Sequence, residues 1–121
     1  MKKNIVIIED DASNRELAKM TLSGAGFQVF AANSIRDGAK VLDQVKADFL
    51  VCDYNLPDGI GTQLVANLKT SNPIYRKLPV LMLTIEDGEN KKEEGKASGV
   101  SAWMVKPFKP STLLKTVESL I

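Results

Sequence analysis

Five short apolar segments recur along the chain, each followed by a longer stretch of mixed polarity. Several are apolar at every position rather than at every second one, which is typical of strands buried on both faces of a parallel sheet. Each segment is also too short to form a helix. The predicted strands are residues 5–8, 27–31, 49–52, 80–83 and 102–105.

The stretches between the strands carry apolar residues at spacings of three and four, which places them on one face of a helix. Ser13 is expected to cap the first helix, and either Asn33 or Ser34 the second. The third helix is predicted to begin near Thr62, and the last follows Pro110. Strand and helix thus alternate five times, which predicts a single α/β domain over residues 1–121 with a parallel sheet and helices on both faces.

The fourth helical segment, residues 86–98, differs from the others. Ala97 is its only candidate core residue, and it contains Gly88 and Gly95. Each glycine costs roughly 1 kcal/mol in a helix interior. The charged run 91–94 most simply faces solvent. We therefore expect this segment to be short, frayed or mobile.

Composition excludes several chemistries. The chain has no histidine, which excludes Ser-His-Asp and Cys-His triads and histidine metal sites. The single cysteine, Cys52, allows no internal disulfide, fits a reducing compartment and is expected to be an inert core residue. A net charge of +1 argues against binding dominated by a nucleic-acid backbone. Without a signal peptide or an apolar run near the roughly 20 residues of a membrane span, we expect a cytoplasmic protein.

Ligands of such a fold bind where the strands end, at the carboxyl edge of the sheet. Glu9 and Asp10 follow the first predicted strand, Asp53 the third, Thr84 the fourth and Lys106 the fifth. The topology therefore gathers carboxylates, a hydroxyl and an ammonium at one rim. Crowded carboxylates repel one another, which raises their pKa values or recruits a cation.

Oxygen ligands of this kind suit Mg²⁺. We expect Asp10 and Asp53 to bind the ion directly and Glu9 to reach it through water. The backbone carbonyl of Asn55 is a further candidate ligand. The ordinary alternative is that residues 9–11 form an acidic loop that stabilises the N-terminus of a helix.

A carboxylate at such a site can also attack a phosphoryl group and form an acyl phosphate. Asp53, on the central strand, is the expected acceptor, although an aspartate there could simply begin a turn. Lys106 would place a positive charge beside a phosphoryl oxygen, and the Thr84 hydroxyl would donate to one.

The order and separations of these residues resemble the receiver domain of two-component response regulators over essentially the whole chain. The matching positions are residues 9–10, Asp53, 56–61, Thr84 and 106–108. The resemblance implies a flavodoxin-like fold with strand order 2-1-3-4-5 and Mg²⁺ as cofactor. It also implies that Asp53 is phosphorylated by a partner histidine kinase or histidine phosphotransfer protein.

The resemblance further implies how the signal leaves the domain. Thr84 moves toward the phosphate and Trp103 turns inward, which changes the surface of helix 4, strand 5 and helix 5. That surface would bind a downstream protein, with no direct contact to nucleic acid or membrane. The domain would be a monomer or a phosphorylation-dependent dimer, and the bond before Pro107 would be cis.

Some positions depart from the usual pattern of this family or are expected to set how long the phosphoaspartate lasts. Trp103 stands where Tyr or Phe is usual, so we expect its larger indole to restrict inward rotation, and the alternative is a static, half-buried indole. Ile85 replaces a small residue and should narrow access to Asp53. Asn55, Ile85 and Glu86 are expected to tune the lifetime of the phosphoaspartate.

Three other functions remain as alternatives. A pseudo-receiver that binds partners without being phosphorylated would tolerate Ile85 and Trp103. A Mg²⁺-dependent aspartyl-phosphate hydrolase of the haloacid dehalogenase type would need Asp-x-Asp after the first strand, where residues 9–11 read Glu-Asp-Asp. FMN binding would need a first loop rich in Ser, Thr and Gly, and this acidic loop would repel the phosphate.

Overall fold

The computed structural model describes residues 2–85 and 89–121. The five predicted strands are confirmed to within one residue at either end. The elements are, in chain order, β1 (Asn4–Ile8), α1 (Ala12–Gly24), β2 (Gln28–Ala32), α2 (Ile35–Gln44), β3 (Phe49–Asp53), β4 (Asn55–Leu56), β5 (Gly59–Ile60), α3 (Gly61–Ser71), a 3₁₀ turn (Pro73–Tyr75), β6 (Val80–Thr84), α4 (Glu89–Ser98), β7 (Ala102–Val105) and α5 (Pro110–Leu120).

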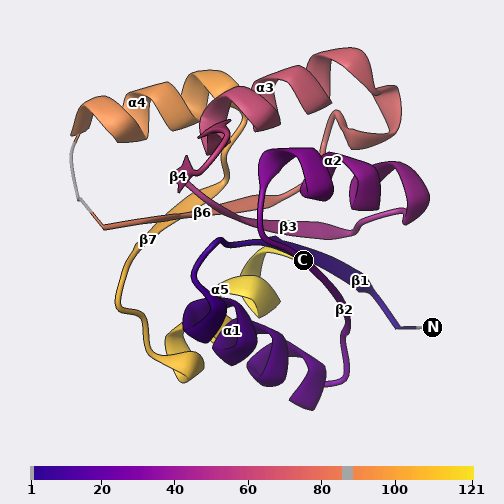
Figure 1. Ribbon diagram of the computed structural model, residues 1–121, viewed down its shortest axis with the longest axis vertical. Coiled ribbons are helices and arrows are strands. Elements are labelled where there is room, and N and C mark those ends of the chain that lie inside the picture. The colour runs from indigo at the N-terminus through magenta and orange to yellow at the C-terminus, as the bar shows by residue number, and fades with distance from the viewer. Residues whose placement is uncertain (1, 86–88) are drawn as a thin grey trace.

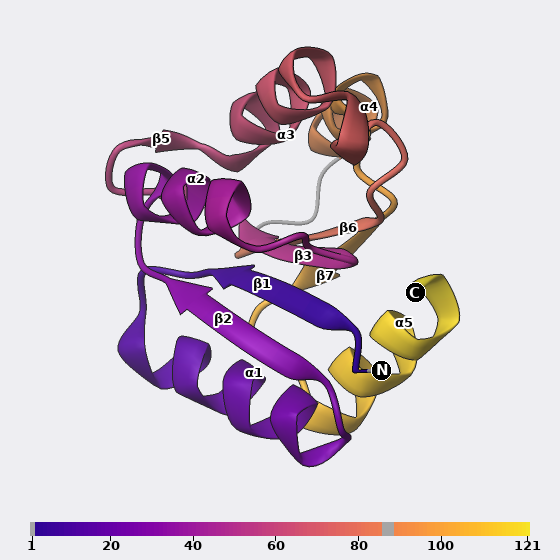
Figure 2. The same cartoon turned by 90° about the vertical axis from the view of Figure 1, so that its right-hand side faces the viewer.

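The main sheet has the strand order β2-β1-β3-β6-β7, and all of its pairings are parallel. Because β4 and β5 form a separate antiparallel hairpin, this is the order 2-1-3-4-5 over the five long strands. Helices α1 and α5 cover one face of the sheet, and α2, α3 and α4 cover the other (Figure 1, Figure 2). The flavodoxin-like fold is confirmed.

The inner strands β3 and β6 are buried along their whole length, as expected for strands covered on both faces. Side chains on β1 alternate between two cores. Val6 and Ile8 pack in the core that includes residues of α2 and α3, while Ile5 and Ile7 pack with residues of α1 and α5. This period of two fixes which side chains reach each layer of helices.

The helix caps differ in part from the prediction. Asp11, and not Ser13, caps α1, and its carboxylate accepts a 2.8 Å hydrogen bond from the backbone N–H of Asn14. A carboxylate there also interacts favourably with the positive end of the helix dipole. Ser34 caps α2 and accepts from the N–H of Asp37 at 3.1 Å, so one of the two alternatives for that helix is confirmed.

A short hairpin after β3, formed by β4 and β5, was not predicted. Asp58, between its two strands, accepts hydrogen bonds from the backbone N–H groups of Ile35 (2.9 Å) and Arg36 (3.0 Å). These donors have no partner within the first turn of α2, so the hairpin satisfies them. The segment that follows β3 is thereby tied to α2.

None of the helices in the described part of the chain has the length and the apolar character that a membrane-spanning helix requires.

Candidate functional site

The expected rim forms at the carboxyl ends of the parallel strands. Asp53 is the last residue of β3 and Thr84 the last of β6, while Glu9 and Lys106 directly follow β1 and β7. Strand β3 lies between β1 and β6 in the sheet, so Asp53 occupies the middle of the rim.

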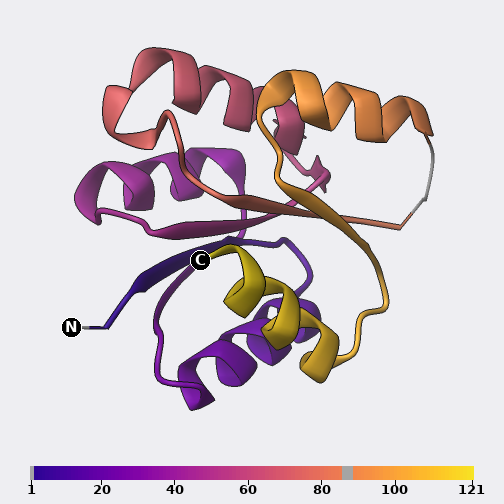
Figure 3. The ribbon, with the colours of Figure 1, turned by 180° about the vertical axis from the view of Figure 1, so that it is seen from behind.

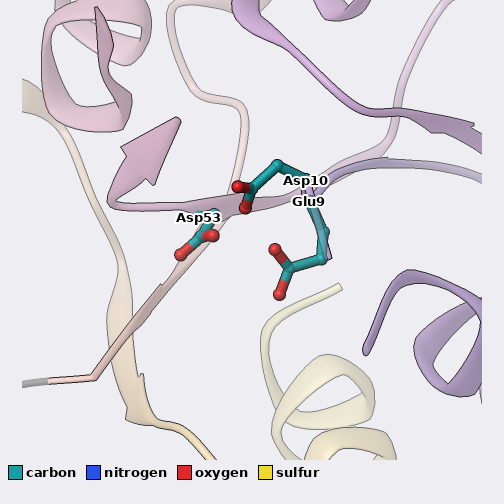
Figure 4. A group of neighbouring side chains, drawn as sticks. All are labelled: Glu9, Asp10 and Asp53. Atoms are coloured by element: carbon teal, nitrogen blue, oxygen red, sulfur yellow. The ribbon is translucent and has the colours of Figure 1, made fainter. Parts of the chain in front are cut away.

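Three carboxylates converge there (Figure 4). Glu9, Asp10 and Asp53 each offer an oxygen, and these oxygens all lie within 4.8 Å of one another. Glu9 is fully buried and Asp53 is 3% exposed, whereas Asp10 is open to solvent. Negative charge this concentrated is unfavourable unless a cation or a proton compensates it.

Lys106 supplies part of that compensation. Its ammonium Nζ lies 3.0 Å from Oε1 of Glu9 and 3.0 Å from Oδ2 of Asp53. Burial alone would lower the pKa of Lys106, but its hydrogen bonds and ion pairs with the two carboxylates outweigh burial and raise that pKa. Lys106 therefore remains charged and holds both carboxylates in place.

The protonation of the two aspartates differs because their surroundings differ. Burial raises the pKa of Asp53 to about 8, with the adjacent Glu9 carboxylate acting in the same direction and Lys106 against it. Burial would also raise the pKa of Asp10, but hydrogen bonds with Asp53 and Glu9 outweigh it, so that pKa is lowered. A divalent cation among these oxygens would favour the ionised form of each.

The donor set fits Mg²⁺. Magnesium prefers carboxylate, carbonyl and water oxygens, and the cluster offers carboxylate oxygens from two adjacent strand ends. Zinc and copper favour thiolate or imidazole ligands, and the chain has no histidine. Because Asp10 is exposed, solvent reaches the cluster.

Arg15 supports the loop that carries two of these carboxylates. Its guanidinium donates to the backbone carbonyl oxygens of Glu9 (2.9 Å) and Asp10 (3.3 Å). The N–H of Asp11 donates to Oε2 of Glu9 at 3.2 Å. Sequence reasoning missed Arg15, because its partners are main-chain atoms and leave no residue pattern.

The other expected site residues lie at the strand ends that form this rim or within two residues of them in the sequence. Thr84 is 2% exposed at the end of β6, the strand paired with β3. Asn55 is exposed and begins the hairpin. The Lys106–Pro107 peptide bond is cis.

Trp103, on β7, is partly buried and pairs with an aromatic neighbour. Its ring centroid lies 5.8 Å from that of Tyr54, with the planes tilted by 43°. Ile85, directly after β6, is 66% exposed. The predicted role of Glu86 concerns a residue outside the described part of the chain.

Two tightly packed residues line the backbone of the expected acceptor. Cys52 is buried, and its Sγ donates to the carbonyl oxygen of Asp53 at 3.4 Å. Burial raises the pKa of the Cys52 thiol far above its usual range, so it is an inert core residue as expected. A Cβ at Gly61 would collide with the same carbonyl oxygen and would lie 3.0 Å from Sδ of Met82. Gly61 belongs to the segment 56–61 that resembles the family pattern, but its residue type alone does not reveal this close approach.

Comparison with known sequences identifies the family. A family model described as the response regulator receiver domain matches residues 5–118. The phosphate regulon transcriptional regulatory protein PhoB of Escherichia coli is 30% identical over 121 residues, which is all of this chain and 52% of that protein. The virulence transcriptional regulatory protein PhoP of Salmonella typhimurium is 31% identical over 117 residues, or 97% of this chain and 51% of that protein. The chain thus spans about half the length of the curated relatives it matches.

Comparison with solved structures agrees with the sequence matches. The chemotaxis response regulator CheY4 of Vibrio cholerae superposes with a TM-score of 0.94 at 34% identity, and each chain is covered completely. A response regulator from Chloroflexus aurantiacus gives a TM-score of 0.90 at 29% identity, covering 99% of this chain and 98% of the other. With the carboxylate rim, the parallel sheet and these matches all in agreement, the chain belongs to the response regulator receiver domains of two-component systems.

Proposed function

We propose that this domain is a phosphoacceptor switch in which Asp53 receives a phosphoryl group from a partner histidine kinase or histidine phosphotransfer protein. The observation that carries the proposal is the position of Asp53, 3.0 Å from the Lys106 ammonium and inside the carboxylate cluster. A carboxylate so placed can act as a nucleophile. Because these 121 residues contain no histidine, a phosphohistidine donor lies outside them.

The proposed transfer exchanges one bond for another. An Oδ atom of Asp53 attacks phosphorus while the P–N bond to the partner's histidine breaks. The electron pair of that bond stays with the imidazole, which takes up a proton and leaves as neutral histidine. Lys106 then pairs with one phosphoryl oxygen, and the Thr84 hydroxyl donates to another.

Asp10 and Asp53 would hold Mg²⁺ directly, with Glu9 acting through water and the Asn55 carbonyl as a further ligand. When bound, the ion screens the negative phosphoryl donor from the carboxylates. Lys106 holds Glu9 and Asp53 in position, and Arg15 fixes the loop that carries Glu9 and Asp10.

Phosphorylation would then be read by Thr84 and Trp103 and passed to the surface formed by α4, β7 and α5. That surface would bind a downstream protein in the cytoplasm, and the domain would act as a monomer or a phosphorylation-dependent dimer. The relatives named as transcriptional regulators are longer than this chain. We therefore do not assign nucleic-acid binding to the domain itself.

Intact-mass measurement after incubation with acetyl phosphate and Mg²⁺ tests the proposal. The wild type should gain one phosphoryl group, and Asp53→Asn should gain none. Asp43→Asn makes the same chemical change at an exposed position of α2, so it should label like the wild type. An adduct that survives Asp53→Asn would refute the assignment, and a wild type that never labels would favour a pseudo-receiver. Steady turnover of a phosphomonoester would instead indicate a hydrolase.

The effect of Ile85 on access can be measured in the same assay. Ile85→Ala should label faster than the wild type with acetyl phosphate, because the branched side chain follows Thr84 directly at the strand end. The rate at which the adduct decays in each protein would show whether Ile85 also sets its lifetime. Equal labelling rates would contradict the proposed restriction of access.

A further inference from the structure

Helix α4 differs from the other helices in how it can be attached to the domain. Its sequence contains one apolar side chain, Ala97, and that side chain is exposed. A surface helix normally buries an apolar stripe of three to four side chains in every two turns. Helix α4 nevertheless lies alongside α3 (Figure 1, Figure 3). Polar contacts must therefore contribute most of its attachment.

Glu94 makes the most extensive of these contacts among the described side chains of α4. Its Oε2 accepts a hydrogen bond from the Tyr54 hydroxyl at 2.9 Å, and its Oε1 accepts one from the Thr62 hydroxyl at 2.6 Å. Tyr54 directly follows β3, and Thr62 lies in the first turn of α3. Thr62 is 1% exposed, so its hydroxyl could not easily replace the lost bond with one to water. One carboxylate thus joins α4 to α3 and to the residue that follows β3.

A second polar contact lies just beyond the C-terminal end of α4. The ammonium of Lys69, on α3, donates to the carbonyl oxygen of Gly99 at 2.8 Å. This contact joins the end of α4 to α3 but does not reach β3. Glu94 therefore has the separate effect of connecting α4 to the segment that leaves β3.

Tyr54 is itself firmly connected to the rim. Its N–H donates to the carbonyl oxygen of Leu83 at 2.7 Å, and its ring packs on Trp103 at 5.8 Å. Its backbone continues directly from Asp53. The side chain that Glu94 binds therefore belongs to the residue next to the carboxylate expected to react.

We propose that Glu94, Tyr54 and Thr62 form a polar latch, in which Glu94 is a positioning residue that couples α4 to the segment following Asp53. Motion of α4 away from α3 breaks both hydrogen bonds. The Tyr54 ring is then free to move relative to the Trp103 ring that it contacts. Because coupling is reciprocal, a change that displaces Tyr54 also loosens α4. The proposal relies on the proposed function only for the role of Asp53, since the latch is a property of the unphosphorylated protein.

Amide hydrogen exchange of residues 96–98 in the unphosphorylated protein tests the latch. Glu94→Ala should exchange about tenfold faster than the wild type, because the net loss of these charge-assisted bonds favours local opening. Glu93→Ala is the matched control, since Glu93 and Glu94 are both exposed neighbours on the same helix and the two substitutions change helix propensity equally. Glu94→Gln keeps one acceptor oxygen and should fall between them. Equal exchange in the Glu94→Ala and Glu93→Ala proteins would overturn the proposal.

Two further measurements separate positioning from simple helix stability. Trp103 is the only tryptophan of the chain, so its emission should shift in Glu94→Ala and not in Glu93→Ala. The effect of Glu94→Ala on exchange should also be smaller in a Tyr54→Phe background, because one of the two bonds is already lost. If the effects of Glu94→Ala and Tyr54→Phe on the exchange rate were fully additive, or if Trp103 emission did not change in Glu94→Ala, coupling through Tyr54 would be excluded.

The same experiments in an Asp53→Asn background distinguish failure of the latch from failure of the proposed function. The latch predicts the same difference in amide exchange rate between Glu94→Ala and Glu93→Ala whether or not Asp53 can be phosphorylated. If the wild type labels on Asp53 but Glu94→Ala leaves exchange unchanged, the latch is wrong and the acceptor assignment stands. If exchange responds as predicted but no protein labels, the latch stands and the acceptor assignment fails.

Discussion

Substitution of Gly61 by alanine tests whether close packing behind Asp53 fixes the position of the reactive carboxylate. Gly61 is the first residue of α3, and its N–H donates to the carbonyl oxygen of Tyr54 at 2.7 Å. A Cβ added there would approach the carbonyl oxygen of Asp53 more closely than real Cβ atoms ever do. It would also lie 3.0 Å from Sδ of Met82 and 3.1 Å from Sγ of Cys52.

The expected magnitude follows from what can move. The sulfur atoms can yield slightly, but the carbonyl oxygen belongs to the central strand β3, which is paired on both sides. Relieving the overlap requires Asp53 or α3 to shift by roughly 1 Å. Overpacking of this kind costs about 1–3 kcal/mol, and a misplacement of about 1 Å can slow a reaction on the order of 100-fold. We therefore expect Gly61→Ala to lose both stability and phosphoryl acceptance.

Urea unfolding followed by Trp103 emission, together with acetyl phosphate labelling, measures both effects. Helix propensity alone would make alanine more stable than glycine by up to about 1 kcal/mol, so the steric argument predicts the opposite sign. Gly24→Ala is the control, because a Cβ on that last residue of α1 meets nothing within 4 Å. It should be neutral or slightly stabilising. A Gly61→Ala protein as stable and as quickly labelled as the wild type would refute the reasoning.

Three other outcomes are expected. Asp58→Ala should destabilise the protein near neutral pH, because backbone hydrogen bonds from the first turn of α2 lower the pKa of the Asp58 carboxyl. That contribution is present above the ordinary pKa of 3.8 and is lost as the pH falls through the lowered value, so urea unfolding should show the two proteins converging in acid. Tyr75→Phe should lower the free energy of unfolding in urea by about 1–3 kcal/mol, because the buried hydroxyl accepts from the N–H of Ala47 and donates to the carbonyl oxygens of Leu42 and Val45. Mg²⁺ should raise the melting temperature of the wild type and of Asp43→Asn but not of Asp10→Asn, and an equal rise in all three would argue against the carboxylate cluster as the binding site.

The main architecture could be predicted from sequence because the strands are buried on both faces. Continuous apolar runs such as 49–52 and 80–83 have few other stable environments in a chain of this size. Once strands and helices alternate, the right-handed crossover rule makes the sheet parallel. The strand ends then meet at one edge, which is why Glu9, Asp53 and Lys106 could be placed together without coordinates.

The features that sequence reasoning missed depend on contacts that leave no periodic pattern. The hairpin strands have two residues each, too few to show alternation. Asp58 accepts a hydrogen bond from the first backbone N–H group of α2, which lies 23 residues away in the sequence, whereas capping rules consider only residues next to the helix end. At α1 the local rule did apply but selected the wrong residue, because Asp11 and Ser13 are both good N-caps and only the backbone path decides between them.

Helix α4 shows a different limit of pattern analysis. Its polarity marked it as unlike the other helices and predicts a short, frayed or mobile segment, but polarity alone could not show what attaches it. The structure gives a helix over Glu89–Ser98 that is anchored through Glu94 to groups 40 and 32 residues earlier in the chain. A glutamate within a charged run looks like a solvated residue until its partners are placed beside it.

The short segment after Asp53 attaches to the helices on either side in two unequal ways. Toward α2, Asp58 binds backbone groups at the start of a helix that buries Leu42 in the core. Toward α4, Tyr54 binds a side chain of a helix that buries no comparable apolar residue in its described part. Local opening is easier where less apolar surface must be exposed. A displacement beginning at Asp53 is therefore expected to move α4 before α2, because α4 has less apolar anchoring than α2.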